Sequence, residues 1–450
     1  MIPFGRVHVC LFRVAAIALS AQALRAAELP KGRVLETVAC GADPTQTYAL
    51  YVPTSFDASK QWPVLFCFDP GARGKAPVER FQAAAEKFGY IVAGSNNSRN
   101  GPWEANAAAI SAMMSDVRRY FPLQPKRIYV AGLSGGARVA CQIAIGGIAQ
   151  GVIACSAAFP GSEPPDRVPF AFFGTAGVTD FNYLELRRAD RELEDRRAAH
   201  RVVIFPGGHE WLPADLAVEA LAWLDLQAMR AGTLAKDAAW IAAQLAERQA
   251  RVPATAGERY LALKSITADF KGLMDVAAAE KSVAELGASR DVRDWLKAQR
   301  ASEQKERSLS EALLESVQDG SAKEVQKAVA ALREKTSAPE DTPERQMATR
   351  VLQGAGSAIG EGAREAMRSR DFGTAVALLE MSVLLRPERG QTWFELARAR
   401  ANTRDRKGVV AALEKAAGAG FKDVGRVEAE KAFDAMRKDP AFVAAVAAMK

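Results

Sequence analysis

The chain has 450 residues, of which 49% are hydrophobic and 25% are charged, and both values are typical of a globular protein with two or three domains. Its formal charge of +7 at pH 7 is spread along the chain. Because no run of lysines and arginines of the kind that follows a phosphate backbone is present, nucleic acid is not expected as a partner.

The first 26 residues have the layout of a secretory signal peptide. Arg6 and Arg13 come before the apolar stretch VAAIALSAQA, which ends in the small-residue cleavage site AQA. This stretch is too short to span a bilayer and no longer apolar run follows, so no stable membrane span is expected. We expect residues 1–26 to be removed on export, which would make the protein periplasmic or secreted. An uncleaved amphipathic start is the alternative.

Residues 33–230 alternate between short apolar runs and helical patterns. The apolar runs, which are typical of buried strands, are YALYV, PVLFCF, YIVAGS, IYVAG, GVIAC, FAFFG and RVVIF. Helical stretches such as PVERFQAAAEKFG, AAAISAMMSDVRRYF and YLELRRADRELEDRR lie between most of them. This alternation predicts an α/β domain with a mostly parallel sheet that is covered on both faces, and ligands then bind at the carboxyl ends of its strands.

A serine in a glycine-rich turn follows one of these strands. Ser134 lies in GLSGG, after RIYVA and before the helical pattern ARVACQIAI. A nucleophile elbow requires this order, because glycines permit a strained turn and the start of the helix offers N–H groups to a developing oxyanion. We interpret Ser134 as a catalytic nucleophile; the alternative is a glycine turn with an incidental serine.

A serine hydroxyl needs a base, and His209 is expected at the correct edge of the sheet. It follows the strand RVVIF, whereas His200 precedes that strand and so lies at the opposite end. Asp180, in GTAGVTDFNY, follows the strand FAFFG and is interpreted as the acid that orients His209. The alternative role of Asp180 is an N-cap for the helix that begins near FNYLELR.

Two backbone N–H groups should stabilise the oxyanion of a tetrahedral intermediate. Gly135, directly after the nucleophile, is expected to provide one of them. Gly71 in DPGARG is expected to provide the other, with Ala72 in reserve, because Pro70 has no N–H. A simple turn at Pro70 and Gly71 is the alternative.

Two tryptophans lie near these residues. Trp103 follows SNNSRNGP, and Trp211 is two residues past His209. Both are candidate substrate contacts on which an aromatic or sugar group could stack; the alternative is packing within the loops. The connection from Cys155 to Phe170 is too short for a sizeable lid helix, which favours an open site for soluble esters or chain ends.

Four cysteines follow the signal peptide, all in or beside apolar stretches: Cys40, Cys67, Cys141 and Cys155. Buried free thiols are favoured over disulfides, although an exported chain would permit both. No cysteine or histidine spacing is typical of a metal site, and HEW at 209–211 does not continue as a zinc helix because Pro213 occupies the second ligand position. We therefore expect no metal and no cofactor.

The motifs FDPGARG, SNNSRNGPW, GLSGG, GTAGVTDFNY and GGHEW, with the chain order of nucleophile, acid and histidine, resemble the α/β-hydrolase superfamily. Within it they look like the esterase branch that includes polyhydroxybutyrate depolymerases, feruloyl esterases and dienelactone hydrolases. The resemblance covers residues 33–230, and DPG stands where many relatives have His-Gly. It implies acyl-serine chemistry, in which Ser134 attacks an ester carbonyl, His209 relays the proton, and water later releases the acid.

Beyond residue 230 the strand patterns stop. Residues 231–345 show apolar residues at helical spacing and predict an irregular helical region. In residues 346–450 a pattern recurs after 34 residues, the tetratricopeptide period, and it pairs Asp371, Ala377, Leu379 and Glu380 with Asp405, Ala411, Leu413 and Glu414. We expect tetratricopeptide-like helical repeats there, closed by DAMRKDPAFVAAV.

Two functions compete at this point. The first is an exported serine esterase that acts on a small-molecule or polymer-end ester and whose C-terminal helices bind a protein, a peptide or the substrate polymer. The second is an interaction protein built on repeats, with a catalytically inactive hydrolase domain. The set of Ser134, Asp180 and His209 favours the enzyme, and a serine peptidase is its nearest variant.

Overall fold

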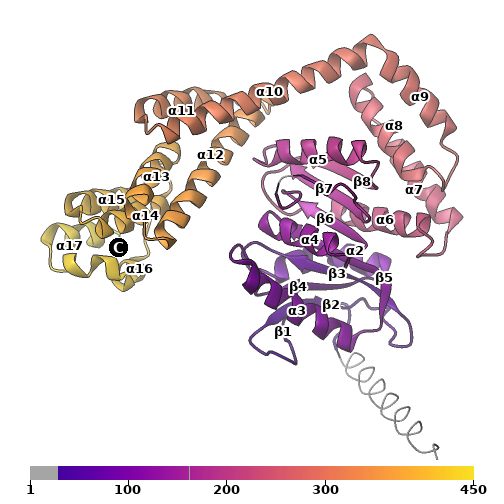
Figure 1. The fold of residues 1–450 in the computed structure, drawn as a ribbon, viewed down its shortest axis with the longest axis horizontal. Helices are drawn as coiled ribbons and strands as arrows, with labels where there is room; N and C mark the ends of the chain where they lie inside the picture. Colours follow the sequence, from indigo (N-terminus) through magenta and orange to yellow (C-terminus); the bar gives the residue numbers. More distant parts are fainter. Residues whose placement is uncertain (1–28, 162, 450) are drawn as a thin grey trace, which may run out of the picture. The chain divides into compact units, whose positions relative to one another are not determined.

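A computed structural model describes residues 29–161 and 163–449 (Figure 1). The expected signal peptide, residues 1–26, lies outside the described residues. The described chain divides into two compact units, one that ends at Ala298 and one that begins at Gln299. This division falls between the boundaries that were expected at residues 230 and 345.

Unit 1 is built on an eight-stranded sheet. Its strands are β1 (Val34–Ala39), β2 (Thr47–Tyr51), β3 (Trp62–Phe68), β4 (Ile91–Ser95), β5 (Leu123–Leu133), β6 (Gly151–Cys155), β7 (Ala171–Gly177) and β8 (His200–Phe205). They are ordered β1-β2-β4-β3-β5-β6-β7-β8, so that β1 and β8 form the two edges (Figure 1). β1 pairs antiparallel with β2 and β2 with β4, while the pairs from β4 to β8 are parallel. The predicted mostly parallel α/β sheet is thus confirmed.

The strand β1 was not predicted from the sequence. Its residues VLETVA are half-buried or exposed, because β1 is an edge strand with a neighbour on one side only. It therefore lacks the continuous apolar run that marks the inner strands, such as the fully buried β4 and β6.

Helices cover both faces of the sheet, as predicted. The buried core on one face includes side chains of α3 (Trp103–Tyr120), α4 (Gly135–Ile145) and α5 (Tyr183–Asp195). The core on the other face includes side chains of α2 (Lys75–Phe88) and α6 (Ala214–Arg230). Each helix turns an apolar stripe inward; α2, for example, buries Val78, Phe81 and Ala85 at helical spacing.

Three further helices belong to unit 1: α7 (Ala238–Ala250), α8 (Ala256–Phe270) and α9 (Ala277–Ala288). Asp269, whose side chain is buried, ties α8 to α6 and α7, because it accepts hydrogen bonds from Trp223 Nε1 at 2.6 Å and from Arg248 Nη1 at 2.9 Å. The helical part of the chain therefore begins within the unit that carries the sheet.

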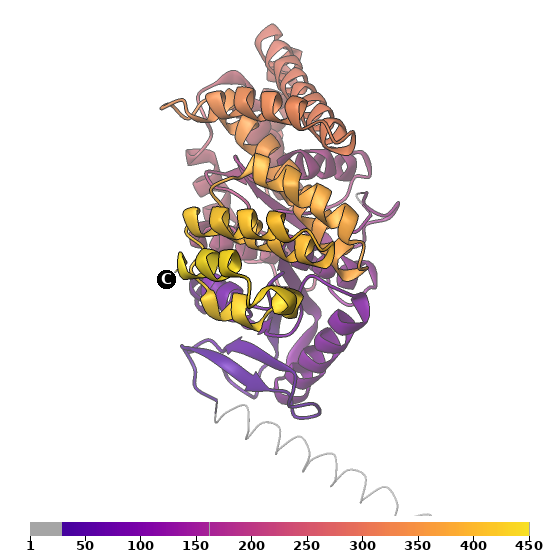
Figure 2. The same cartoon turned by 90° about the vertical axis from the view of Figure 1, so that its left-hand side faces the viewer.

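Helix α10 (Arg290–Gln318) runs across the division between the units. Unit 2 continues with α11 (Ala322–Thr336), α12 (Pro343–Arg368), α13 (Phe372–Leu385), α14 (Gly390–Asn402), α15 (Arg406–Gly418), α16 (Val424–Ala429), the 3₁₀ helix η1 (Lys431–Met436) and α17 (Pro440–Ala447). The described part of unit 2 is helical throughout, which confirms the expected all-α region. Figure 2 shows its later helices, coloured orange to yellow, stacked side by side.

The sequence repeat of 34 residues corresponds to a repeated local structure. Asp371 caps α13 and Asp405 caps α15, and in each case the carboxylate accepts a hydrogen bond from the backbone N–H three residues later. The preceding residues, Arg370 and Arg404, both adopt a positive φ, of 61° and 60°. Two helix starts 34 residues apart are thus built in the same way.

The four described cysteines lie in the core, as expected from the apolar stretches around them. Cys40, Cys67, Cys141 and Cys155 are free and buried. Burial raises the pKa of the Cys155 thiol to about 11, so this group stays protonated at neutral pH. Within residues 29–161 and 163–449, no helix combines the length and the apolar character needed to cross a membrane.

Candidate active site

Ser134 lies in a sharp turn between the end of β5 and the start of α4. Its φ of 53° and ψ of −120° are a backbone conformation that costs free energy for any residue with a Cβ, so the surrounding structure must hold it. One such contact is the backbone hydrogen bond from Ser134 N to Cys155 O on β6, at 2.8 Å. The turn places Ser134 at the carboxyl edge of the sheet, half-buried, directly before the first residue of a helix.

The glycines on either side of Ser134 are required by close backbone contacts. A methyl group on Gly132 would lie 2.0 Å from the carbonyl oxygen of Gly136, and one on Gly136 would lie 2.0 Å from the carbonyl oxygen of Phe68. Real Cβ atoms do not approach backbone oxygens so closely, so both positions exclude a side chain. The glycines allow the turn to pack against the end of β3.

His209 and Asp180 form a direct pair. Nδ1 of His209 lies 2.8 Å from Oδ1 of Asp180, whose carboxylate is completely buried. An ionised carboxylate can only accept a hydrogen bond. Nδ1 of His209 therefore carries the proton in this contact, and Nε2 is left as the basic nitrogen. The backbone N–H of Asn182 donates to the same Asp180 oxygen at 2.9 Å, and the ring of Phe181 stacks on the imidazole at 4.0 Å between centroids.

The loops that carry these two residues are bonded to each other. Thr179 donates to the carbonyl oxygen of Gly207 from both its backbone N–H, at 3.0 Å, and its hydroxyl, at 2.8 Å. Gly177 lies so close to Gly207 that a methyl group on it would come within 2.3 Å of the Gly207 carbonyl. The position of the histidine relative to the acid is therefore set by backbone contacts rather than by the pair alone.

The three residues predicted as a triad follow three strands of one sheet edge: Ser134 follows β5, Asp180 follows β7 and His209 follows β8. The structure joins Asp180 to His209 by a hydrogen bond. Among the described residues it gives Ser134 Oγ no hydrogen-bond partner, His209 included. His200 begins β8 at the opposite end and bonds to Ala198 O, as its sequence position predicted.

Asp69, which sequence reasoning did not select, organises the loop after β3. Its carboxylate is buried and accepts hydrogen bonds from Gly71 N at 2.8 Å, from Arg73 Nε and Nη2 at 2.8 and 3.0 Å, and from Trp211 Nε1 at 2.9 Å. The N–H of Gly71, predicted as an oxyanion donor, is thus directed at Asp69. The only feature of the sequence that could have pointed to Asp69 is its place directly before Pro70 in the motif DPG.

The two predicted substrate contacts have different surroundings. Trp211 is buried, packs edge-on against Phe81 at 6.3 Å between ring centroids and bonds to Asp69, so its ring is part of the core. This burial corresponds to the packing alternative. Trp103, the first residue of α3, is 47% exposed.

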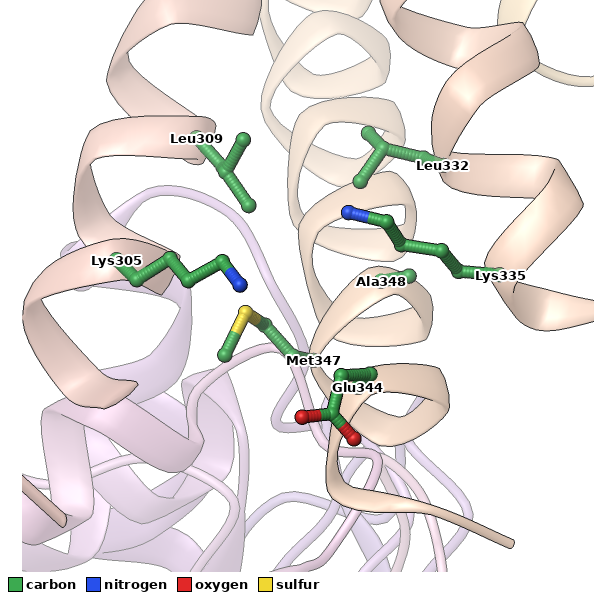
Figure 3. Close-up of a pocket in the computed structure, with 7 residues that line it drawn as sticks. All are labelled: Lys305, Leu309, Leu332, Lys335, Glu344, Met347 and Ala348. Carbon is green, nitrogen blue, oxygen red and sulfur yellow. The ribbon is translucent and has the colours of Figure 1, made fainter. Parts of the chain in front are cut away.

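Among the described residues, no group of His, Cys, Asp or Glu side chains is arranged to hold a metal ion. A pocket in unit 2 lies between α10, α11 and α12, and Figure 3 shows the side chains of two lysines and a glutamate beside the apolar side chains that line it. Its lining residues are Lys305, Leu309, Leu332, Lys335, Glu344, Met347 and Ala348. It contains neither serine nor histidine, so the candidate site for hydrolytic chemistry is the edge of the sheet in unit 1.

No protein-family model matches the sequence, and no curated protein matches it. Several solved structures are similar to part of the chain. An S-formylglutathione hydrolase from Staphylococcus aureus shares 15% identity, with 44% of this chain and 98% of that chain covered and a TM-score of 0.34. An esterase from Pyrobaculum calidifontis shares 13% identity, with 48% of this chain and 93% of that chain covered and a TM-score of 0.37. Esterase B from Lactobacillus rhamnosis shares 16% identity, with 50% of this chain and 97% of that chain covered and a TM-score of 0.36.

Proposed function

We propose that the protein is a serine hydrolase that cleaves carboxylic esters. The observation that carries the proposal is the strained turn at Ser134, on the same sheet edge as the hydrogen-bonded pair of His209 and Asp180. Backbone strain of this kind persists where the structure over-determines it, and such positions cluster at active sites. The resemblance of the surrounding motifs to esterases also supports the proposal.

In this mechanism Ser134 Oγ adds to the carbonyl carbon of the ester while its proton passes to His209 Nε2. The π electrons of the carbonyl move to its oxygen and give a tetrahedral oxyanion. When the oxyanion collapses, the bond to the alcohol oxygen breaks, the alcohol takes the proton from His209, and an acyl-serine remains. Asp180 stabilises the imidazolium through its bond to Nδ1.

Water then hydrolyses the acyl-serine by the same steps. A water molecule gives a proton to His209 Nε2 while its oxygen adds to the acyl carbon. Collapse of the second oxyanion returns the proton to Ser134 Oγ and releases the carboxylic acid. All acid–base steps use groups of this chain, and the proposal requires no metal or cofactor.

The test is labelling by a fluorophosphonate, which reacts with an activated serine, together with turnover of a panel of aryl, short-chain and hydroxyalkanoate esters. We expect the folded wild type to be labelled at Ser134 and to turn over at least one ester. Ser134→Ala should abolish labelling and lower turnover by several orders of magnitude. Ser59→Ala, which changes an exposed serine outside the site, is the matched control and should behave as wild type.

Labelling that persists in Ser134→Ala would show that the nucleophile lies elsewhere. A folded wild type with neither labelling nor turnover would favour the second candidate, an interaction protein with an inactive hydrolase domain. The repeated helix starts at Asp371 and Asp405 are the observation behind that candidate, because tetratricopeptide-like repeats offer a surface to a protein or peptide. A panel that includes peptides separates the esterase from a serine peptidase.

We also propose that the protein is exported and that the mature chain begins between Leu24 and Glu28. The basic start, the short apolar stretch and the AQA site support this proposal. The intact mass of protein purified from the native host should correspond to a chain that lacks the first residues. A mass that includes Met1 would contradict export by this route.

A further inference from the structure

The backbone N–H groups from which the second oxyanion donor was expected already have acceptors in this structure. The N–H of Gly71 donates to Asp69 Oδ1 at 2.8 Å, and the N–H of Ala72, the reserve candidate, donates to Asp69 O at 3.1 Å. Both groups are therefore engaged within their own turn. A tetrahedral oxyanion bound only by Gly135 N–H would lack the second donor that acyl transfer usually requires.

The side chain of Asn100 lies against the residue that follows the nucleophile. A methyl group built on Gly135 would be 1.9 Å from Asn100 Oδ1 and 3.4 Å from Asn100 Nδ2. The backbone N–H of Asn100 donates to Pro70 O at 3.0 Å. The amide is thus placed beside the Ser134 turn while its backbone is bonded to the loop after β3.

The loop that carries Asn100 is held by its own hydrogen bonds. The buried side chain of Asn106 accepts from Ser98 Oγ at 2.7 Å and from Arg99 N at 3.0 Å, and it donates to Arg99 O at 2.9 Å. Arg99 also forms an antiparallel bridge with Gly71. These bonds fix the backbone on the N-terminal side of Asn100.

The amide of Asn100 differs from the other amides of this loop. The amides of Asn96, Asn97 and Asn106 all bond to the protein, whereas that of Asn100 is exposed and makes no hydrogen bond within the described residues. No bond fixes which amide atom faces the turn, so a rotation of the terminal group can present Nδ2 without breaking a contact. The hydrogen-bonded loop thus presents an amide without a partner among the described residues beside Gly135, the residue after Ser134.

We propose that Asn100 is the second oxyanion donor, with its Nδ2–H hydrogen-bonded to the former carbonyl oxygen when Ser134 adds to the ester. No proton is transferred; the oxygen carries the electron pair from the carbonyl, and the amide and Gly135 N–H stabilise its charge. Side-chain amides can perform this role in other serine hydrolases. The inference rests on the proposed function, since an oxyanion forms only if Ser134 reacts.

The test compares Asn100→Ala and the near-isosteric Asn100→Asp with the wild type, using the ester that the wild type turns over best. Loss of one oxyanion donor lowers kcat by about 10²–10³-fold, and we expect this for both variants, with KM little changed because the bond forms in the transition state. Binding of a boronic acid that forms a tetrahedral adduct with Ser134 should weaken in parallel. Asn96→Asp is the matched control. It makes the same chemical change in the same loop, at an amide that bonds to Glu36 O on β1 and is not part of the proposed site.

Thermal unfolding of each variant distinguishes a local effect on turnover from a loss of the fold. Asn100→Asp in addition keeps the shape of the side chain. A loss of kcat and of boronic-acid affinity in both Asn100 variants, with Asn96→Asp near wild type, supports the inference. If the wild type depends on Ser134 and both Asn100 variants are as active as it, the inference is overturned and the proposed function stands. If the folded wild type shows neither turnover nor labelling, the proposed function itself is overturned.

Discussion

Asp69 connects two loops that the proposed mechanism needs. One of its carboxylate oxygens accepts from Gly71 N in the loop after β3, and the other accepts from Trp211 Nε1, two residues beyond His209. The side chain of Asp69 is fully buried, so these bonds are shielded from water and bonds to a charged acceptor are worth more than neutral ones. Asp69 therefore ties the loop that carries His209 to the loop after β3, and in the proposed mechanism it would act as a positioning residue for the histidine.

Removal of the bond between Trp211 and Asp69 should affect stability and turnover together. Trp211→Phe keeps an aromatic ring against Phe81 but deletes the indole N–H, which leaves Asp69 Oδ2 with Arg73 Nη2 alone. We expect the free energy of unfolding to fall by about 1.5–3 kcal/mol, the contribution of a hydrogen bond to a charged group. We also expect kcat to fall several-fold because His209 is less firmly placed.

Urea unfolding and ester turnover measure both effects, with Trp240→Phe as the matched control. Trp240 packs edge-on against Phe88, and its indole N–H makes no hydrogen bond within the described residues, so the same substitution there removes no such bond. Equal losses of stability in the two variants would contradict the assigned role of the Asp69 bond. An unchanged kcat in Trp211→Phe would contradict its positioning role.

At this scale the sequence predicts the part of the site that follows from strand ends. Ser134, Asp180 and His209 could be placed on one edge because parallel strands carry their carboxyl ends together, and the structure shows Asp180 bonded to His209. The environments of Gly71, Asn100 and Trp211 could not be predicted. They depend on how three loops, far apart in the sequence, contact one another. The local spacing of apolar residues, which predicts helices and strands, does not predict such contacts.

At the scale of elements, α6 belongs to two packing arrangements at once. One of its faces lies on the sheet, where Leu221 and Leu224 are in the core, and another packs with α7 and α8 through Leu226 and Met229. Its apolar residues are consequently spread around the helix, and almost the whole run from Leu216 to Met229 is buried. A helix buried on several faces must have neighbours beyond the sheet.

This packing explains why the structure does not divide the chain near residue 230, where the sequence pattern placed a boundary. The strands do stop at β8, and a change from strands to helices normally marks a new domain. In this chain, α7 and α8 do not begin a new domain, because their apolar side chains pack in one cluster with those of α6. The observation that could have indicated this is the sequence of α6 itself, ALAWLDLQAM, which is too apolar for a helix with one exposed face.

At the scale of the whole molecule, unit 1 should function without unit 2. All residues of the proposed site, from Asp69 to Trp211, lie in the unit that ends at Ala298. The first turns of α10 belong to it as well, since Val292 is fully buried and a methyl group on Gly257 of α8 would lie 2.2 Å from the Trp295 ring. A chain that begins at Leu29 and ends at Ala298 therefore keeps the core of α6–α9 intact.

We expect this chain to fold cooperatively and to retain the ester turnover of the full protein. A chain that ends at Gly232 keeps the sheet but loses Asp269, which leaves the buried indole N–H of Trp223 unpaired and removes a carboxylate beside the mostly buried Arg201. Removal of α7 and α8 also exposes Leu226 and Met229 of α6 to water, so the shorter chain should unfold at lower urea concentration or aggregate. Urea unfolding followed by circular dichroism, with ester turnover on the same samples, distinguishes the two chains. Equal stability would show that α7–α9 are separable from the sheet, and a folded but inactive chain to Ala298 would show that unit 2 completes the site.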